Sequence, residues 1–183
     1  MMKKFMKNLV ESTFTKHNMI LLLIEIVGIG LCIAADLLTK EYIYGPIANG
    51  AADIIIIEGV IRFTAVENTG ASFGIFEGKT NILAIFSITV VVVIFIVQVF
   101  SISNRNALLR TSLVLIVAGG IGNVIDRFAL GFVRDFIYFE LIDFAVFNVA
   151  DSCLTIGNIL LVIYVIFCYK PDKKPKKEAE NGD

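Results

Sequence analysis

Residues 80–100 read TNILAIFSITVVVVIFIVQVF and contain no charged side chain. In water the mostly β-branched run from Ile88 to Ile96 would favour a strand, but such residues are common in helices surrounded by lipid. A helix needs about 20 predominantly apolar residues to cross the hydrocarbon core of a bilayer. The segment therefore predicts a membrane-spanning helix over residues 80–100.

Three further segments have a similar length and apolar character: residues 19–38, 107–127 and 152–169. The last of them is uncharged, and the second carries its charges only near its two ends. No internal repeat and no second compact unit is evident. We therefore expect a single membrane-embedded domain over residues 19–169, an all-α integral membrane protein built as a four-helix transmembrane bundle.

Composition excludes several classes of protein. Hydrophobic residues make up 57% of the 183 residues, charged residues make up 18%, and the mean hydropathy is +0.82. A soluble fold of this size must keep much of its surface polar, so these values exclude a soluble enzyme. The net charge of -1 argues against nucleic acid as a partner. The three cysteines lack metal-binding spacing and His17 is the only histidine, so we expect neither a metal nor a cofactor.

Basic residues are distributed unevenly around the four expected spans. Of the 16 Lys and Arg residues, 11 lie in the two terminal segments or near the loop between the second and third spans. Short cytoplasmic loops retain positive charge. We therefore expect a cytoplasmic arm over residues 1–18, a disordered cytoplasmic tail over residues 170–183, and extracytoplasmic segments over residues 39–79 and 128–151. Glu25 inside the first apolar stretch argues against a cleaved signal peptide.

The two outward segments carry different patterns. Residues 54–57 and 60–66 are rich in strand-forming side chains, which predicts a small extracytoplasmic β-sheet inserted into the helical bundle. Residues 128–147 hold six of the chain's 15 phenylalanines together with Tyr138, a composition typical of an aromatic belt at a membrane interface. We expect this second segment to lie at the membrane surface in an extended form.

Polar side chains inside apolar spans are costly and indicate functional sites by default. Most of those in this chain fall at, or just beyond, the expected outer ends of the spans: Asp36, Asn123, Asp126, Arg127, Asp135 and Asp151. Glu25 is the exception, because at 1.5 Å per residue it lies about 16 Å below Asp36. Glu25 is either a hydrogen-bonded residue near the inner leaflet or part of a proton relay.

Residues 70–74, GASFG, match the GxSxG nucleophile elbow of serine hydrolases. That elbow needs a histidine base, and His17 is expected on the opposite side of the membrane. A Ser72/Lys40 or Ser152/Lys40 dyad, which works without histidine, stays open as an alternative. Two glycines around a serine also recur in ordinary turns, so the motif is weakly specific.

Asp135 and Asp151 favour a different chemistry. Two carboxylates that share one proton can activate a water molecule with the ionised group and protonate a peptide carbonyl with the other. Structural roles stay open as well. Asp135 could pair with Arg134 or Arg127, and Asp151 at a helix start, with Asn148 as the cap, could complement the helix dipole.

Five motifs between residues 36 and 152 resemble, in order, the motifs of the lipoprotein signal peptidase (signal peptidase II) family: DLLTK (36–40), NTGASF (68–73), GGIGNVIDR (119–127), GFVRDFI (131–137) and FNVADS (147–152). This resemblance implies a four-helix membrane bundle with a small extracytoplasmic sheet. It also implies cleavage of the signal peptide from bacterial prolipoproteins before the lipid-modified cysteine.

The resemblance implies that Asp135 and Asp151 are the catalytic aspartates of an aspartic endopeptidase. It further implies supporting or substrate-binding roles for Asp36, Lys40, Asn68, Gly70, Asn123, Asp126, Arg127 and Asn148. The chain departs from the family pattern at four positions: Glu67, Ser72, Arg134 and Ala145.

The two arginines near Asp135 lead to different expectations. Arg127 should hold Asp126 or the outer sheet in place through charge-assisted hydrogen bonds. Arg134 replaces a usual valine and, if its segment is extended, faces away from Asp135, since successive side chains of a strand point to opposite faces. Replacement of Arg134 by valine should then be tolerated.

The resemblance thus implies a monomeric, multi-pass member of this family in the bacterial inner membrane. Its site should lie near the extracytoplasmic face, and its partners should be membrane lipid and a prolipoprotein that carries a diacylglyceryl-cysteine. The alternative from another class is a small proton-coupled transporter using Glu25 and Asp36. A transporter needs ionisable groups near the bilayer midplane, whereas most of those in this chain gather at one face.

Overall fold

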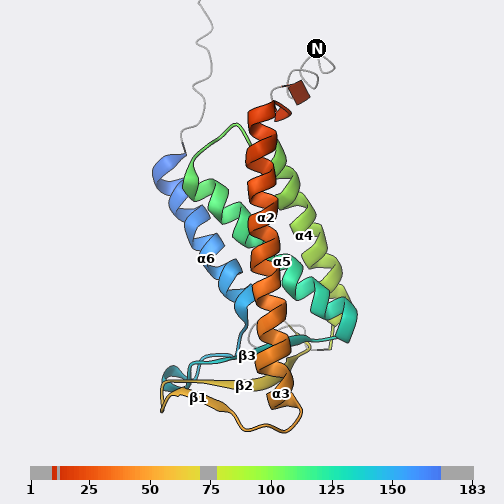
Figure 1. Ribbon diagram of the computed structural model, residues 1–183, viewed down its shortest axis with the longest axis vertical. Coiled ribbons are helices and arrows are strands. Elements are labelled where there is room, and N and C mark those ends of the chain that lie inside the picture. The colour runs from red at the N-terminus through yellow and green to blue at the C-terminus, as the bar shows by residue number, and fades with distance from the viewer. Residues whose placement is uncertain (1–9, 12, 71–77, 170–183) are drawn as a thin grey trace, which may run out of the picture.

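The computed structural model describes residues 10–11, 13–70 and 78–169 of the 183-residue chain. Four apolar helices, each long enough to cross a membrane, form a bundle with a small sheet at one end (Figure 1). This arrangement confirms the predicted fold class. The four helices are α2 (Lys16–Thr39), α4 (Thr80–Phe100), α5 (Ala107–Leu130) and α6 (Val149–Ile163).

Polar residues define where these helices begin and end. The side chain of Thr15 accepts from the Asn18 N–H at the start of α2, and that of Asn106 accepts from Leu108 and Leu109 at the start of α5. Such side chains satisfy backbone donors that have no partner inside the helix. Helix α5 ends at Gly131, whose φ of 83° is left-handed and suits a residue without a Cβ.

The first helical segment is longer than the predicted span that ends at residue 38. After α2 the chain continues through a π-helical turn, η1 (Lys40–Tyr44), and a short helix, α3 (Gly45–Ala48). Lys40 does not mark an exit from the bundle, because its side chain is fully buried. Helix α5 also runs past residue 127 to Leu130, and α6 continues into a second π-helical turn, η4 (Tyr164–Cys168).

The sheet has three antiparallel strands in the order β1 (Ile54–Ile57), β2 (Ile61–Asn68) and β3 (Val133–Tyr138). The third strand comes from the aromatic segment that was expected to be extended, and its pairing with β2 was not foreseen. The register places Asp135 opposite Val66. A short 3-10 helix, η3 (Glu140–Ile142), follows β3.

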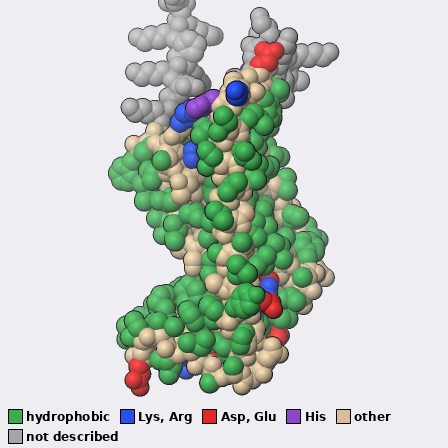
Figure 2. Space-filling model, in the orientation of Figure 1, with side chains coloured by type: hydrophobic (Ala, Val, Ile, Leu, Met, Phe, Trp, Pro, Cys, Tyr) green, Lys and Arg blue, Asp and Glu red, His purple; other side chains and the backbone are tan. Residues whose placement is uncertain are grey.

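Helix α5 is the core of the bundle. In Figure 1 it crosses between α6 and α4 behind α2. In its most apolar stretch of 18 residues, 61% of the residues are buried, whereas the share is 17% or less in the corresponding stretches of the other three helical segments. Gly119, Gly120 and Gly122 allow this close approach: a Cβ at Gly119 would lie 2.4 Å from the Ala150 carbonyl oxygen of α6. The outward faces of the other helices are covered by apolar side chains, as lipid contact requires (Figure 2).

Candidate active site

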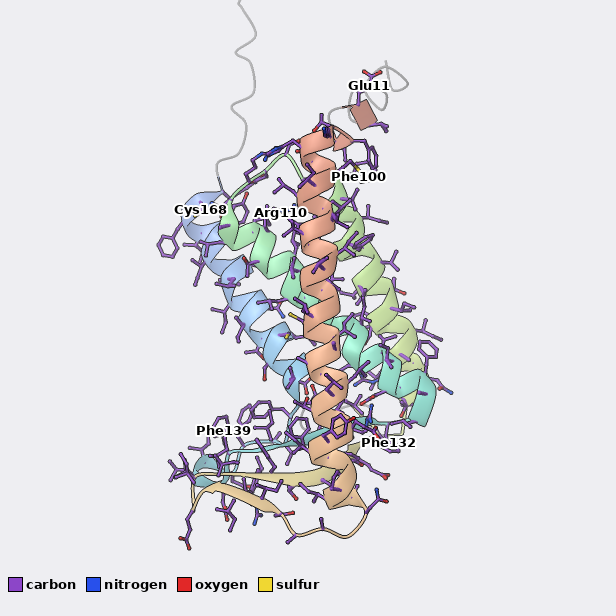
Figure 3. The ribbon with its side chains drawn as sticks, viewed as in Figure 1. Glu11, Phe100, Arg110, Phe132, Phe139 and Cys168 are labelled. Atoms are coloured by element: carbon purple, nitrogen blue, oxygen red, sulfur yellow. The ribbon has the colours of Figure 1, made fainter. Side chains whose placement is uncertain are left out.

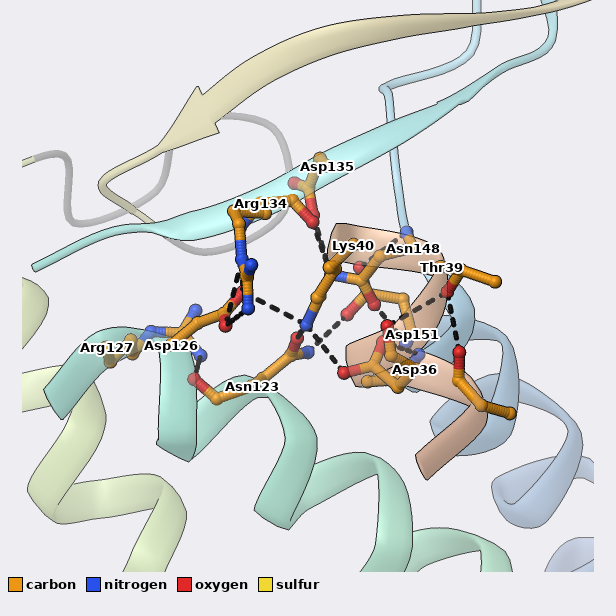
Figure 4. Close-up of polar contacts among 12 residues, drawn as sticks. Asp36, Thr39, Lys40, Asn123, Asp126, Arg127, Arg134, Asp135, Asn148 and Asp151 are labelled. Atoms are coloured by element: carbon orange, nitrogen blue, oxygen red, sulfur yellow. Dashed lines mark hydrogen bonds and ion pairs between the residues drawn. The ribbon is translucent and has the colours of Figure 1, made fainter. Parts of the chain in front are cut away.

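Asp135 and Asp151 lie together where the sheet meets the bundle (Figure 4). Asp135 belongs to β3 and is buried, with 1% of its surface exposed. Asp151 occupies the first turn of α6 and is half-buried. Both line one cavity. The structure thus brings together the two carboxylates that the sequence placed sixteen positions apart in separate motifs.

Asn148 connects these two carboxylates. As the N-cap of α6, its side-chain oxygen accepts from the Asp151 N–H at 2.8 Å, and its own N–H donates to Asp151 Oδ2 at 3.2 Å. This reciprocal pattern is a capping box. The side-chain amide of Asn148 donates to Asp135 Oδ1 at 2.7 Å. A single buried residue therefore fixes the orientation of both acids.

Two more amides complete the hydrogen bonds of the pair. Asn68 Nδ2, at the end of β2, donates to Asp135 Oδ2 at 2.9 Å. Asn123 Nδ2, on α5, donates to Asp151 Oδ1 at 2.7 Å. Each of the four carboxylate oxygens thus accepts a hydrogen bond from an N–H group, and among the described residues no Lys or Arg forms an ion pair with either carboxylate.

Lys40 is the centre of a neighbouring charge network. It is fully buried, and its ammonium group lies 2.7 Å from Asp36 Oδ2 and 3.1 Å from Asp126 Oδ2. Asp36 also accepts from the Ala150 N–H at 2.9 Å, at the start of α6. Lys40 Nζ further donates to Asn123 Oδ1 at 3.4 Å. The network therefore links α2, α5 and α6 directly beneath the two candidate acids.

Asp126 is held by Arg134, a contact that sequence reasoning missed. The backbone N–H of Arg134 donates to Asp126 Oδ2 at 3.0 Å, and its Nη2 lies 2.7 Å from Asp126 Oδ1. Glu41, largely exposed, lies 3.7 Å from the same guanidinium. Arg134 does not line the cavity of Asp135, as the strand alternation predicted. No sequence signal gave its partner, because the contact depends on how α5 turns into β3.

Arg127 does not hold Asp126, which was the first of the two roles expected for it. Its guanidinium donates to the Gly70 carbonyl oxygen at 3.1 Å and to the Asn123 carbonyl oxygen at 3.5 Å. Among the described residues these are its hydrogen-bond acceptors, and Asp126 is not one of them. Gly70 N–H in turn donates to Asn68 Oδ1 at 3.0 Å. Arg127 therefore supports the end of β2, which is the second of the two roles that the sequence suggested.

The environment of Asp135 favours its protonated form. Burial and the nearby charge of Asp151 raise the pKa of Asp135 to about 7, against the lowering effect of the hydrogen bonds from Asn68 and Asn148 and of the Lys40 charge. The buried site holds four carboxylates, those of Asp36, Asp126, Asp135 and Asp151, and three cations, those of Lys40, Arg127 and Arg134. One proton on the pair would balance this set of charges.

The cavity beside the two acids measures about 890 Å³. Its walls come from β2, β3, the segment before α6, and helices α4, α5 and α6. Many of them are apolar: Val66, Val133, Phe139, Ile142, Phe144, Val146, Phe147, Leu154 and Ile156. Asp135, Asp151, Asn68, Asn123 and Arg127 supply its polar side. A site with these walls can accept an apolar chain next to a peptide bond.

The serine alternatives gain no support from the described residues. Ser152 Oγ donates to the Asn148 carbonyl oxygen at 3.0 Å, whereas Lys40 is engaged by Asp36 and Asp126, so no Ser152/Lys40 dyad forms. Ser72 lies outside the described residues. His17 lies at the opposite end of the bundle, where it contacts Arg105.

Glu25 is engaged in a separate ion pair. Arg110 Nη2 lies 2.5 Å from Glu25 Oε2, and Gln98 Nε2 donates to the same oxygen at 2.9 Å. Of the two readings left open by the sequence, these contacts favour the hydrogen-bonded residue over a free proton carrier.

Comparison with known proteins agrees with this geometry. The family model described as signal peptidase (SPase) II matches residues 28–167. Lipoprotein signal peptidases of Lactobacillus johnsonii and Clostridium tetani are each 40% identical to this chain, over 142 and 146 residues, covering 78% of this chain and 91% and 92% of the relatives. A solved bacterial membrane enzyme structure, determined by the in meso method at 2.3 Å resolution, has a TM-score of 0.68 and 32% identity, covering 85% of this chain and 94% of that one. This chain belongs to the signal peptidase II family.

Proposed function

We propose that this membrane protein is an aspartic endopeptidase that removes the signal peptide from diacylglyceryl-modified prolipoproteins by cleaving before the lipidated cysteine. The observation that carries the proposal is the bridge made by Asn148, which joins Asp135 and Asp151 into one hydrogen-bonded unit on the wall of an apolar cavity. Relatives named lipoprotein signal peptidase support this function. They give no support to a proton-coupled transporter.

The two acids have different parts in the proposed reaction. Asp135, whose pKa is raised by burial and by Asp151, carries the shared proton and acts as the acid. Asp151 is less buried than Asp135 and lies in the first turn of α6, where the helix dipole interacts favourably with a negative charge. Asp151 is therefore the base.

The chemical step uses one water molecule. Asp151 takes a proton from the water as its oxygen attacks the carbonyl carbon of the scissile peptide, and Asp135 gives its proton to the carbonyl oxygen. The tetrahedral intermediate then collapses: the C–N bond breaks, the proton held by Asp151 passes to the leaving nitrogen, and one hydroxyl proton of the intermediate returns to Asp135 as the new carboxyl group forms. The products are the released signal peptide and a free amino group on the lipidated cysteine.

The same proposal includes the cellular setting. The protein acts as a monomer in the bacterial inner membrane, with the catalytic end near the extracytoplasmic face and both termini in the cytoplasm. The distribution of basic residues supports this orientation. The apolar lining of the cavity suits a lipidated substrate.

The decisive experiment is cleavage of a diacylglyceryl-modified prolipoprotein by purified variants. Asp135→Asn and Asp151→Asn should each lower turnover by at least about a thousandfold, because an amide can neither hold nor donate the shared proton. Ser152→Ala and Ser72→Ala are the controls and should retain most activity. Near-normal turnover by either Asn variant would refute the assignment of the pair.

A further inference from the structure

A second polar cluster lies at the end of the bundle opposite the carboxylate pair. Figure 3 places Arg110 near that end, far from Phe132 and Phe139 beside the sheet. Arg110 Nε and Nη2 donate to the two oxygens of Glu25 at 2.6 and 2.5 Å. The negative charge of Glu25 is therefore balanced within the protein.

Arg105 lies beside this cluster and is exposed. Its Nη2 donates to Asn18 Oδ1 at 2.9 Å, and its Nη1 contacts His17 Nε2. Within residues 10–11, 13–70 and 78–169, the ion pairs include no carboxylate partner for Arg105. Among the described residues its guanidinium is thus held by Asn18 and His17 and is not paired with a carboxylate.

A cavity of about 440 Å³ extends from Arg105 between α2 and α5. The ion-paired Glu25 and Arg110 also line it, and the rest of the lining is mostly apolar, with Leu21, Ile24, Ile102, Ala107 and Val114. Gly28 lies on its wall as well, and a Cβ there would lie 3.5 Å from Val114. The cavity therefore combines the exposed cation of Arg105 with apolar walls, and Ile24 on one wall is 61% exposed on the surface of the bundle.

We propose that this cavity binds one anionic phospholipid, with the phosphate on Arg105 and an acyl chain along Leu21, Ile24 and Val114. The planar guanidinium matches phosphate oxygens in geometry and charge. Basic pockets between membrane helices bind anionic headgroups for the same reason. A zwitterionic lipid would add a headgroup cation, and the carboxylate that lines this cavity, Glu25, is already engaged by Arg110.

The test uses the purified full-length protein in detergent, titrated with dioleoylphosphatidylglycerol or dioleoylphosphatidylcholine and analysed by native mass spectrometry. One phosphatidylglycerol should be retained about fivefold more tightly than phosphatidylcholine, the ratio expected for one cation near the headgroup. Arg105→Gln should abolish this preference. Thr111 also lines the cavity, so Thr111→Phe should fill it while leaving Arg105 intact and should abolish retention of the lipid.

Lys16→Gln is the matched control, because it removes the same charge at the same end of the bundle outside the cavity. It should retain the preference for phosphatidylglycerol. Equal binding of the two lipids by the unmodified protein, or equal losses in Lys16→Gln and Arg105→Gln, would overturn the proposal. Unchanged retention in Thr111→Phe would also overturn it. Prolipoprotein cleavage should continue in Arg105→Gln, which separates this site from the proposed catalytic one.

Discussion

At the scale of single residues, Arg134 has a structural role that its position next to Asp135 in the sequence does not indicate. Its guanidinium and backbone N–H both bind Asp126, on the far side of the strand from the cavity. Lys40 is the other cation at Asp126, and its charge is shared with Asp36. Arg134 therefore secures the strand that carries Asp135 to helix α5.

This contact reverses the expectation that Arg134→Val is tolerated. Removing one partner of a desolvated pair costs about 3–5 kcal/mol, and because Lys40 remains near Asp126 we expect a loss of about 3 kcal/mol in the free energy of unfolding. Thermal and denaturant unfolding in detergent would measure it. Arg62→Val is the control, because the Arg62 side chain is 37% exposed and its nearest ion-pair distance is 3.7 Å, so it should change stability by less than about 1 kcal/mol.

The titration of Asp135 gives a second prediction at this scale. Because its pKa is raised to about 7, the pair loses its proton as the pH rises through about 7, and kcat/KM should fall there. The folded state binds this proton more tightly than the unfolded state does. The contribution of this group to stability is therefore present at acidic pH and declines between about pH 4 and pH 7.

Infrared titration of the protonated carboxyl band would measure this pKa directly. Asp151→Asn removes the negative charge near Asp135 and should lower the pKa of Asp135, whereas Asp53→Asn, just before β1 at the sheet edge opposite β3, should not change it. Asp135→Asn identifies the band by its disappearance. An unchanged pKa in Asp151→Asn would show that the two carboxyls do not interact.

At the scale of elements, the glycines of α5 determine how close the helices approach. A Cβ at Gly122 would lie 2.6 Å from Asp36 Oδ2, and so Gly122→Ala should displace the carboxylate that holds Lys40 and the start of α6. We expect cleavage activity to fall at least about tenfold and stability to drop by about 2 kcal/mol. Gly30→Ala in α2, where no atom lies within 4 Å, is the control.

The helices and strands also show which parts of the fold could be predicted from the sequence. Helix α4 covers the residues of the uncharged segment 80–100, because length and apolarity alone specify a membrane helix. The predicted first span ended at residue 38, whereas the helical segment continues through Lys40, because Asp36 and Asp126 balance the charge of Lys40 inside the protein. The pairing of Asp135 with Val66 was equally hidden, since strand partners distant in sequence leave no local pattern.

The candidate site was predictable to a similar extent. The motifs predicted which residues would lie together. All eight residues expected to support the site lie in the hydrogen-bond and ion-pair network around Asp135 and Asp151 or beside it: Asp36, Lys40, Asn68, Gly70, Asn123, Asp126, Arg127 and Asn148. The partners of Arg127 and Arg134 were not predictable. They depend on the direction in which the chain leaves α5 at Gly131, which spacing along the sequence does not encode.

At the scale of the whole molecule, the arrangement predicts a topology that can be tested in intact cells. α2 begins and η4 ends at the same end of the bundle, opposite the sheet (Figure 1). In a background without native cysteines, Glu58→Cys at the sheet should react with a membrane-impermeant thiol reagent, and Arg105→Cys should react only after the cells are opened. The reverse pattern would place the candidate site in the cytoplasm and contradict the proposed orientation.

The cavity beside Asp135 and Asp151 takes part of its wall from Ser87 of α4 and part from Ile156 of α6, a residue 51% exposed on the flank of the bundle. Entry of substrate past this flank would make the encounter a two-dimensional search within the bilayer. The rate should then follow the mole fraction of prolipoprotein in the membrane, so that added inert lipid slows turnover by surface dilution even when the bulk substrate concentration is unchanged.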